Sequence, residues 1–331
     1  MGLVDPLEIA FINKYQGGFP VCEKPFLAVA SELGTDETTL ISIVGNLLKD
    51  GWLSRFGPLY DARQMGGGLT LAALSVPENQ FEKITTIVNA FDEVAHNYRR
   101  EHKLNMWFVL ATETETAIQN VINDIESQAG LKVYNCPKLQ EFYVGLKLHI
   151  DSAGQVDTVP MDIDPDNSSI TPIAPNELER KIIATTQAGL PLVSEPYKLI
   201  ARQLESDVKS IMNSFDALLK NGTIRRIGAV PNHYKLGLRG NGMTVWDVPD
   251  ELVNEIGKKI GCMDFVSHCY QRPRHLPDWP YNLFAMVHGS DKDKAFQKLE
   301  EMEAALFPYN FRHDVLFSSA ILKKSGLRIL R

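Results

Sequence analysis

Two short segments of the sequence share the pattern His-x-Tyr-x-Arg, at residues 96–100 and 268–272. Histidine supplies a proton donor near neutral pH or a metal ligand, and arginine binds carboxylates through paired hydrogen bonds. Because successive side chains of a strand point to opposite faces, each segment would place these three side chains on one face. The pattern predicts a site for a polyanionic ligand. Its members are His96, Tyr98, Arg100, His268, Tyr270 and Arg272.

The same alternation would place Val94 and Val266 on these faces as well. Burying a histidine, a phenol and a guanidinium on a plain core face is costly unless each finds a partner. A single strand histidine is more often structural or exposed than catalytic, and common ancestry can preserve a pattern without function. The match between two diverged segments nevertheless favours a ligand site on this face.

Three further histidines and one arginine are candidate residues of the same site. His102 and His275 follow the two strands, where the loops would fold them over the same pocket. His233 precedes the second sheet, and the corresponding region of the first half offers Arg63 instead, which predicts unequal roles for the halves. The remaining histidines are expected to be structural or exposed: His149, His288 and His313.

The chain is a duplication. The string LLKDG at residues 47–51 returns as LLKNG at 218–222, so that Leu218 lies 171 residues after Leu47. The spacing is 172 where His96 matches His268, and 177 where Asn105 matches Asn282. Such agreement over most of 150 residues, with few gaps, predicts two copies of one unit.

Each copy opens with three short helical patterns followed by an apolar segment that contains a glycine. In the second copy the helices are expected at 177–186, 196–204 and 207–221. Pro25 and Pro196 suit the first helical position, and Thr35 and Ser206 are candidate N-caps. Gly51 and Gly222 are expected to end the third helices, and the copies to begin as winged helix-turn-helix domains.

The rest of each copy alternates between strand and helix patterns. In the second copy strands are expected at 242–248, 265–272, 281–287 and 315–321, with helices at 251–260 and 292–305. This order, βαββαβ, is ferredoxin-like, so the fold class is α+β. Glycines 66–68 are expected to form a turn into the first strand. The expected domains are winged helices at 1–60 and 177–230, ferredoxin-like ligand domains at 61–150 and 231–331, and an acidic, proline-rich, extended linker at 151–176.

Composition narrows the function classes. The 331 residues include 34 Lys and Arg and 41 Asp and Glu, which gives a net charge of −7. We expect a soluble cytoplasmic protein, because no apolar run approaches the roughly 20 residues that span a bilayer and the N-terminus lacks a signal-peptide pattern. Four irregularly spaced cysteines fit reduced thiols better than disulfides or zinc ligands.

A winged helix joined to a ferredoxin-like domain resembles the Lrp/AsnC transcription regulators. A recognition helix, however, normally presents basic and amide side chains to DNA. The first copy instead opens this helix with Asp36 and Glu37, and only Arg55, Arg225 and Arg226 add local positive charge on the wings. We therefore expect no DNA partner.

Several strings point to one enzyme family. Residues 267–270 read SHCY, 279–282 read WPYN and 316–318 read LFS, and in the first half 96–100 read HNYRR and 105–108 read NMWF. In these strings both halves resemble the subunits of siroheme decarboxylases, which are Lrp/AsnC-like chains that form heterodimers in many organisms. The whole chain resembles the fused two-subunit form of denitrifying bacteria.

The resemblance implies loss of the C12 and C18 acetate carboxyl groups of siroheme, giving 12,18-didecarboxysiroheme on the way to haem d1. It implies a soluble enzyme without a cofactor of its own, because the iron arrives within the substrate. Catalytic histidines would come from His96, His102, His233 and His268, as proton donors or iron ligands, and the other site residues would bind substrate. Those are Arg63, Tyr98, Arg100, Tyr270, Arg272 and His275.

The implied partners are the substrate and the other half of the chain, in an internal pseudo-dimer. A further homodimer or a complex with other haem d1 pathway proteins is also compatible with the resemblance. Ala62 stands opposite His233, which argues against two equivalent active sites. A single competent site is the alternative. The alternative function is a tetrapyrrole-responsive regulator that binds without catalysis.

Overall fold

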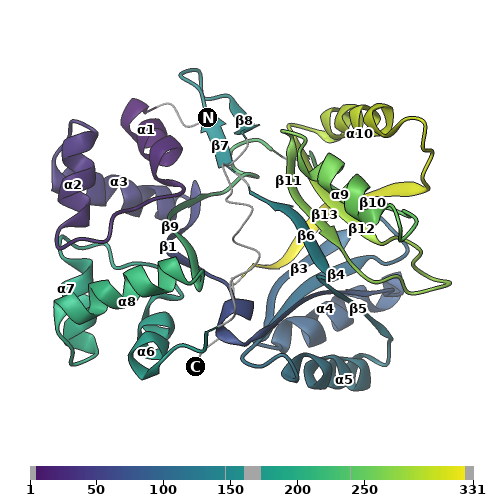
Figure 1. Cartoon of the computed structure of the whole chain (residues 1–331), viewed down its shortest axis with the longest axis horizontal. Helices are drawn as coiled ribbons and strands as arrows, with labels where there is room; N and C mark the ends of the chain where they lie inside the picture. Colours follow the sequence, from purple (N-terminus) through teal and green to yellow (C-terminus); the bar gives the residue numbers. More distant parts are fainter. Residues whose placement is uncertain (1–4, 146, 160–172, 239, 325–331) are drawn as a thin grey trace.

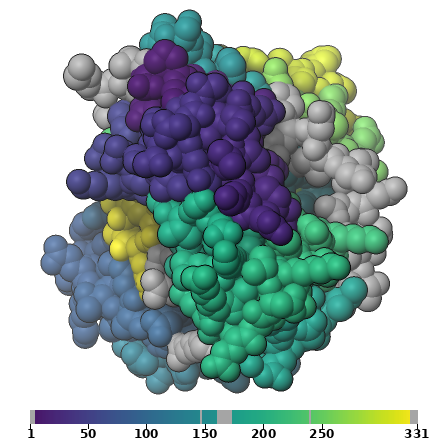
Figure 2. All heavy atoms as spheres, turned by 90° about the vertical axis from the view of Figure 1, so that its left-hand side faces the viewer, coloured from purple at the N-terminus to yellow at the C-terminus, as the bar shows by residue number. Residues whose placement is uncertain are grey.

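The computed structural model describes residues 5–145, 147–159, 173–238 and 240–324. The helices that open the two halves gather on one side of the molecule, and a large sheet with its own helices lies on the other (Figure 1). From the helical side, the first half lies directly against the second (Figure 2). Both expected units of each half are present, and the α+β prediction is confirmed.

The winged helices follow the sequence patterns closely. They comprise α1 (Pro6–Tyr15), α2 (Pro25–Glu32), α3 (Glu37–Lys49) and β1 (Leu53–Tyr60), and α6 (Glu177–Thr186), α7 (Pro196–Gln203), α8 (Val208–Lys220) and β9 (Ile224–Pro231). Pro25 and Pro196 occupy the first helical turn, and Gly51 and Gly222 follow α3 and α8 with φ of 75° and 74°. The predicted caps Thr35 and Ser206 were wrong by one residue. Asp36 and Asp207 cap α3 and α8, because their carboxylates accept the backbone N–H of Thr39 and Ser210.

The wing strands pair with each other across the two halves. β1 and β9 are antiparallel, with Gly57 opposite Gly228. Gly57 has a φ of 140°, and a Cβ atom there would lie 2.5 Å from the backbone nitrogen of Leu190. Only glycine fits this close approach, so the strand glycines serve the junction of the two winged helices, which share one hydrophobic core.

Each half then forms the βαββαβ unit. The first comprises β2 (Gly68–Leu74), α4 (Phe81–Ala90), β3 (Val94–Arg100), β4 (Met106–Thr112), α5 (Ala117–Ala129) and β5 (Val133–Pro137), with the short helices η1 (Arg63–Met65) and η2 (Glu78–Gln80) beside it. The second comprises β10 (Gly240–Trp246), α9 (Val253–Gly261), β11 (Val266–Gln271), β12 (Leu283–Gly289), α10 (Lys292–Leu306) and β13 (His313–Lys324). The predicted elements exist, with ends displaced by up to three residues. The expected turn before β2 is also present, with Gly66 at a φ of 81°.

The two units exchange strands. The first part of β13 pairs with β10 of its own half, and its second part pairs with β3 of the first half. Reciprocally, β6 (Gln140–Val144), which follows β5, pairs with β11 of the second half. The resulting sheet has the order β5-β2-β4-β3-β13-β10-β12-β11-β6. Each half therefore completes the sheet edge of the other.

Three apolar layers hold this part together. One lies between the strands of the first half and α4 and α5, and another between the strands of the second half and α9 and α10. A third contains residues of both halves, among them Trp107, Trp279, Phe284 and Leu316. The His-x-Tyr-x-Arg strands border this third layer, so side chains from both halves meet there.

The expected linker is partly structured. Val156–Val159 forms β8, which pairs with β7 (Lys147–Ile150), and β7 is fixed to α1 by side-chain hydrogen bonds from Asn13 and Gln16. Part of the expected linker thus finds a strand partner, and Leu148 and Ile150 of that partner are buried. Positions 160–172 lie outside the described residues. Among the described helices, none has the length and apolar character needed to cross a membrane.

Candidate active site

The two His-x-Tyr-x-Arg strands keep the same local geometry. In β3 the ring centroids of His96 and Tyr98 are 6.3 Å apart, and in β11 those of His268 and Tyr270 are 6.0 Å apart. These three-residue faces were predicted correctly. Their continuation to Val94 and Val266 was wrong, because a β-bulge interrupts each strand before its histidine. Both valines instead pack in the layers beneath the helices.

The arginines of the two strands are fixed in matching ways. Arg100 donates from Nη1 to the carbonyl oxygen of Leu316, at 2.6 Å, and Arg272 donates from Nη1 to that of Cys136, at 2.5 Å. Burial lowers the pKa of both guanidiniums, that of Arg100 to about 10. The Nε atoms of both arginines are buried without a hydrogen-bond partner in the described part of the chain. Each therefore retains a donor for a ligand.

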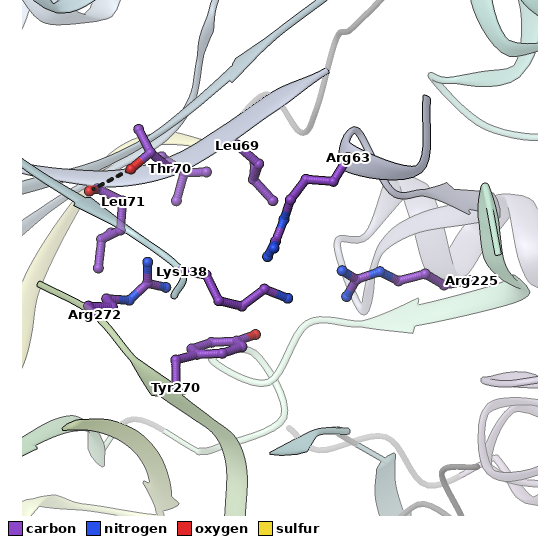
Figure 3. Close-up of a pocket in the computed structure, with 9 residues that line it drawn as sticks. Arg63, Leu69, Thr70, Leu71, Lys138, Arg225, Tyr270 and Arg272 are labelled. Atoms are coloured by element: carbon purple, nitrogen blue, oxygen red, sulfur yellow. Dashed lines mark hydrogen bonds between the residues drawn. The ribbon is translucent and has the colours of Figure 1, made fainter. Parts of the chain in front are cut away.

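A cavity of about 220 Å³ lies beside β11. Figure 3 shows Arg63, Lys138, Arg225 and Arg272 converging on it around the ring of Tyr270. The opposite wall is mostly apolar and comes from the first half, with Leu69, Thr70, Leu71 and Val109. Four cations from four chain segments thus meet in one small space.

Two of these cations are partly balanced by carboxylates. Arg225 donates from Nε and Nη2 to Oδ2 of Asp61, and Lys138 forms an ion pair with Glu141. The Nε of Arg63 is buried and has no hydrogen-bond partner within the described ranges. With two carboxylates against four cations, the cavity keeps positive charge and suits an anionic ligand.

His268, two residues before Tyr270 of the cavity, belongs to a buried polar network. Its Nδ1 lies 2.8 Å from Oγ of Ser267, which in turn lies 2.6 Å from Nε2 of His288. Nδ1 of His288 lies 2.5 Å from Oδ1 of Asn241. Burial, with the charge of Arg225, lowers the pKa of His268 to about 4, so its imidazole is neutral at pH 7.

His233 joins this network from the connection before β10. Its ring lies edge-on to His288, with centroids 5.7 Å apart. Burial lowers the pKa of His233 and of His96 to about 4, and the positive charge of Lys324 contributes to both shifts. His233 therefore contacts the network through His288, and Lys324, which pairs with His96 between β3 and β13, acts on both His96 and His233.

His102 and His275 do not fold over the cavity as expected. Nδ1 of His102 accepts the backbone N–H of Leu104, and its ring meets that of Trp279. Nε2 of His275 lies 2.7 Å from the carbonyl oxygen of Asn135. The loops hold both histidines against the other half's sheet, and neither lines the cavity. Local contacts fix both rings, and their part in a substrate site stays a prediction.

Sequence reasoning missed five side chains at this site: Lys138, Arg225, Ser267, Asn241 and His288. Arg225 was read as a wing residue, and its role here depends on the approach of β9 to the second sheet. His288 was expected to be structural or exposed, yet it is buried within the network. His288 follows Phe284 and Met286 at two-residue spacing, and both contact the apolar layer that contains residues of both halves. This spacing could have predicted that His288 lies on the same strand face.

No metal centre is evident. Among the described residues, no group of three or more His, Cys, Asp and Glu side chains is arranged to hold a metal ion. Burial raises the pKa of the thiols of Cys136 and Cys269, to about 12 for Cys136 and further for Cys269, which disfavours thiolate chemistry there.

Two families match the sequence in both halves. The family described as an AsnC-like ligand binding domain matches residues 65–142 and 235–323. The family described as the siroheme decarboxylase NirDL-like HTH domain matches residues 8–53 and 179–225. Both families thus recur along the chain in the order of the duplication.

Similar proteins cover the chain in one piece or by halves. A siroheme decarboxylase of Hydrogenobacter thermophilus is 33% identical over 95% of this chain and 92% of its own. The NirH subunit of the siroheme decarboxylase of Pseudomonas aeruginosa is 49% identical over 47% of this chain and 93% of its own. The crystal structure of the siroheme decarboxylase NirDL with an iron-uroporphyrin III analogue superposes with a TM-score of 0.70 at 29% identity, over 98% of this chain and 92% of that one.

Proposed function

Because the chain belongs to the siroheme decarboxylase family, we propose that it is a carboxy-lyase acting on the C12 and C18 acetate side chains of siroheme. The product would be 12,18-didecarboxysiroheme, in the route to haem d1. Similarity over almost the whole chain supports this function over the alternative of a regulator that binds without catalysis. The observation that supports a particular site is the cationic cavity around Tyr270 and Arg272.

The cavity fits the charged margin of such a substrate. Siroheme carries eight carboxylates, and at about 220 Å³ the cavity has room for part of the macrocycle edge. Arg63 and Arg225 would bind carboxylates directly, and the free Nε of Arg272 would supply a further donor. The ring of Tyr270 would form the floor, since Arg272 and Lys138 already lie over it.

Each decarboxylation breaks the bond between the acetate methylene carbon and its carboxylate. The electron pair remains on the methylene carbon, where the macrocycle delocalises it, and carbon dioxide leaves. One proton must then reach that carbon to give a methyl group. His268 and His233 are the nearest candidates in the network, and His96, Tyr98 and Arg100 would form a corresponding face in the first half.

Substrate binding would itself prepare the proton donor. In the substrate-free protein burial keeps His233 and His268 neutral. An added carboxylate favours the imidazolium form and raises its pKa. A proton would therefore be taken up with the anionic substrate and delivered during the reaction.

The remaining expectations follow from this proposal. The proposed reaction would use no cofactor of the protein's own, because the iron enters as part of siroheme. Binding of that iron is the alternative role for a histidine of the site. His102 and His275 would act at the margin of the site, near the substrate periphery. We propose a cytoplasmic enzyme without a DNA partner, whose two halves form an internal pseudo-dimer equivalent to a heterodimer. Homodimerisation and association with other haem d1 pathway proteins are further proposals.

Anaerobic incubation with siroheme, followed by mass analysis of the tetrapyrrole, tests the function. We expect the loss of two carboxyl groups as carbon dioxide. An unchanged tetrapyrrole that stays bound would overturn catalysis and indicate the sensor instead. Tight binding of a DNA duplex in the same preparation would further support the regulator.

A further inference from the structure

We infer that Asn241, His288 and Ser267 act as positioning residues that hold His268 in a single tautomer, with a proton on Nδ1 and a lone pair on Nε2. The inference concerns hydrogen bonding in the substrate-free protein. It rests on the proposed function only for its catalytic meaning.

The chain of hydrogen bonds has a fixed beginning at Asn241. Its side-chain Nδ2 donates to the carbonyl oxygen of Leu238, at 2.9 Å, which directs Oδ1 toward His288. An amide oxygen can only accept, so Nδ1 of His288, at 2.5 Å, must carry a proton. Asn241 thus determines which ring nitrogen of His288 is protonated.

The hydroxyl of Ser267 extends this donor–acceptor order from His288 to His268. Burial lowers the pKa of His288 well below its usual value, so its imidazole is neutral and Nε2 is an acceptor. The hydroxyl of Ser267 donates to Nε2 at 2.6 Å, in preference to the carbonyl oxygen of Met286 at 3.5 Å. With its proton so used, Oγ must accept from Nδ1–H of His268, at 2.8 Å.

The first half supplies an internal comparison. The duplication places Ala95 opposite Ser267, Ala111 opposite His288, and Leu69 opposite Asn241. Every polar member of the network is apolar there, and Nδ1 of His96 has no hydrogen-bond partner in the described part of the chain. Only one of the two strand histidines therefore has its tautomer fixed by protein.

The two ring nitrogens of His268 would therefore have different roles. Nδ1 is committed to Ser267, so Nε2 is the atom left to exchange protons with substrate. A proton from solvent would add to Nε2 when the anionic substrate is bound and would pass to the methylene carbon. The neutral ring would then return to the Nδ1–H form, ready for the second carboxyl group.

Nitrogen-15 NMR of the substrate-free full-length chain, with labelled histidines at pH 7, tests the inference. We expect a pyrrole-type signal from Nδ1 of His268 and a pyridine-type signal from Nε2. Ser267→Ala should shift the ring toward the Nε2–H form that free histidine prefers, while Ser267→Thr keeps the hydroxyl and the original tautomer. Ser290→Ala, which removes an exposed serine hydroxyl elsewhere, is the matched control.

An unprotonated Nδ1 in the wild type, or an unchanged tautomer in Ser267→Ala, would overturn the inference. A native backbone spectrum of Ser267→Thr shows that the position tolerates substitution. In turnover, Ser267→Ala should lose about 10–100-fold in kcat with KM nearly unchanged, and Ser267→Thr should recover most of it. If the NMR result holds while the wild type leaves siroheme unchanged, the proposed function fails and the tautomer assignment stands.

Discussion

The strands β3 and β11 present the same three side chains, but their surroundings differ. Both have the bulge, the neighbouring histidine and tyrosine rings, and an arginine that donates to a carbonyl oxygen of the opposite half. Only β11 faces four cations and continues into a polar network through Ser267. The duplication has preserved the framework of the site, while the residues around it have diverged.

The neighbours of each strand come largely from the opposite half. Arg63 of the first half lines the cavity of β11, and Tyr234 of the second half interacts electrostatically with Tyr98 and Arg100 of β3. Both sites contain residues of both halves, so fusion into one chain supplies the two halves in equal amounts. The difference between the halves is therefore a difference between two composite sites.

The largest expected effect separates the two strand histidines. His268→Ala should lower siroheme turnover by about 10²–10⁴-fold, the usual contribution of a positioned proton donor. His96→Ala should cost much less, because its ring lacks the network of Ser267. Anaerobic turnover with mass detection of products measures both. Equal losses in the two variants would show that the halves contribute alike, and full activity in both would exclude these strand faces as the site.

Removing a cation from the cavity should weaken substrate binding. Arg63→Gln loses a charge-assisted hydrogen bond of about 1.5–3 kcal/mol, which corresponds to about 10–100-fold in affinity. Lys235→Gln is the control, since Lys235 lies in the corresponding region of the second half and donates from Nζ to the carbonyl oxygen of Asp50 instead. Titration of siroheme absorbance measures both. A comparable loss in Lys235→Gln would place substrate at the other strand.

Acid should destabilise the fold through the buried histidines. His96, His233 and His268 have pKa values of about 4, against a usual 6.5, so the unfolded chain binds more protons between these limits. Stability present above pH 6.5 is therefore lost as pH falls toward 4. His96→Gln should reduce this dependence by up to about 1.4 kcal/mol per pH unit.

Denaturant unfolding at pH 7, 6 and 5 measures this slope. His149→Gln provides the control, because that side chain is exposed in β7. An unchanged slope in His96→Gln would mean that His96 is protonated in the folded protein, contrary to its burial beside Lys324.

The smallest effect is expected from Ala95→Ser, which gives the first half a hydroxyl opposite Ser267. Turnover should not change measurably, since Ala111 and Leu69 offer no polar group to continue the chain of hydrogen bonds. Turnover and the nitrogen-15 signals of His96 measure the result. A change as large as that of Ser267→Ala would show that one serine suffices to set the tautomer.

Much of the fold was accessible from the sequence. The duplication, the three helices and the βαββαβ order follow from apolar spacing, which is a property of neighbouring residues. The N-caps were displaced by one residue because aspartate competes with threonine and serine for the same N–H groups. The strand 156–159 was missed because its pairing with β7 depends on where α1 lies.

The candidate site was accessible only in part. The faces with His96 and His268 follow from alternation, whereas Val94 and Val266 were misplaced because a bulge depends on the hydrogen-bond register with the next strand. Lys138 enters the cavity because β6 crosses to the second half, a contact between distant parts of the chain.

The sequence by itself determined the repeated framework and the two His-x-Tyr-x-Arg strands, because local periodicity sets which residues share a strand. The tertiary structure alone decided that the ring of His268 meets Ser267, which joins it to His288, and that Arg63 of the first half lines one cavity with Arg225 and Tyr270 of the second. The physical reason is that strand exchange and bulges set the register between distant segments. Charge and proton positions at the site follow from that register.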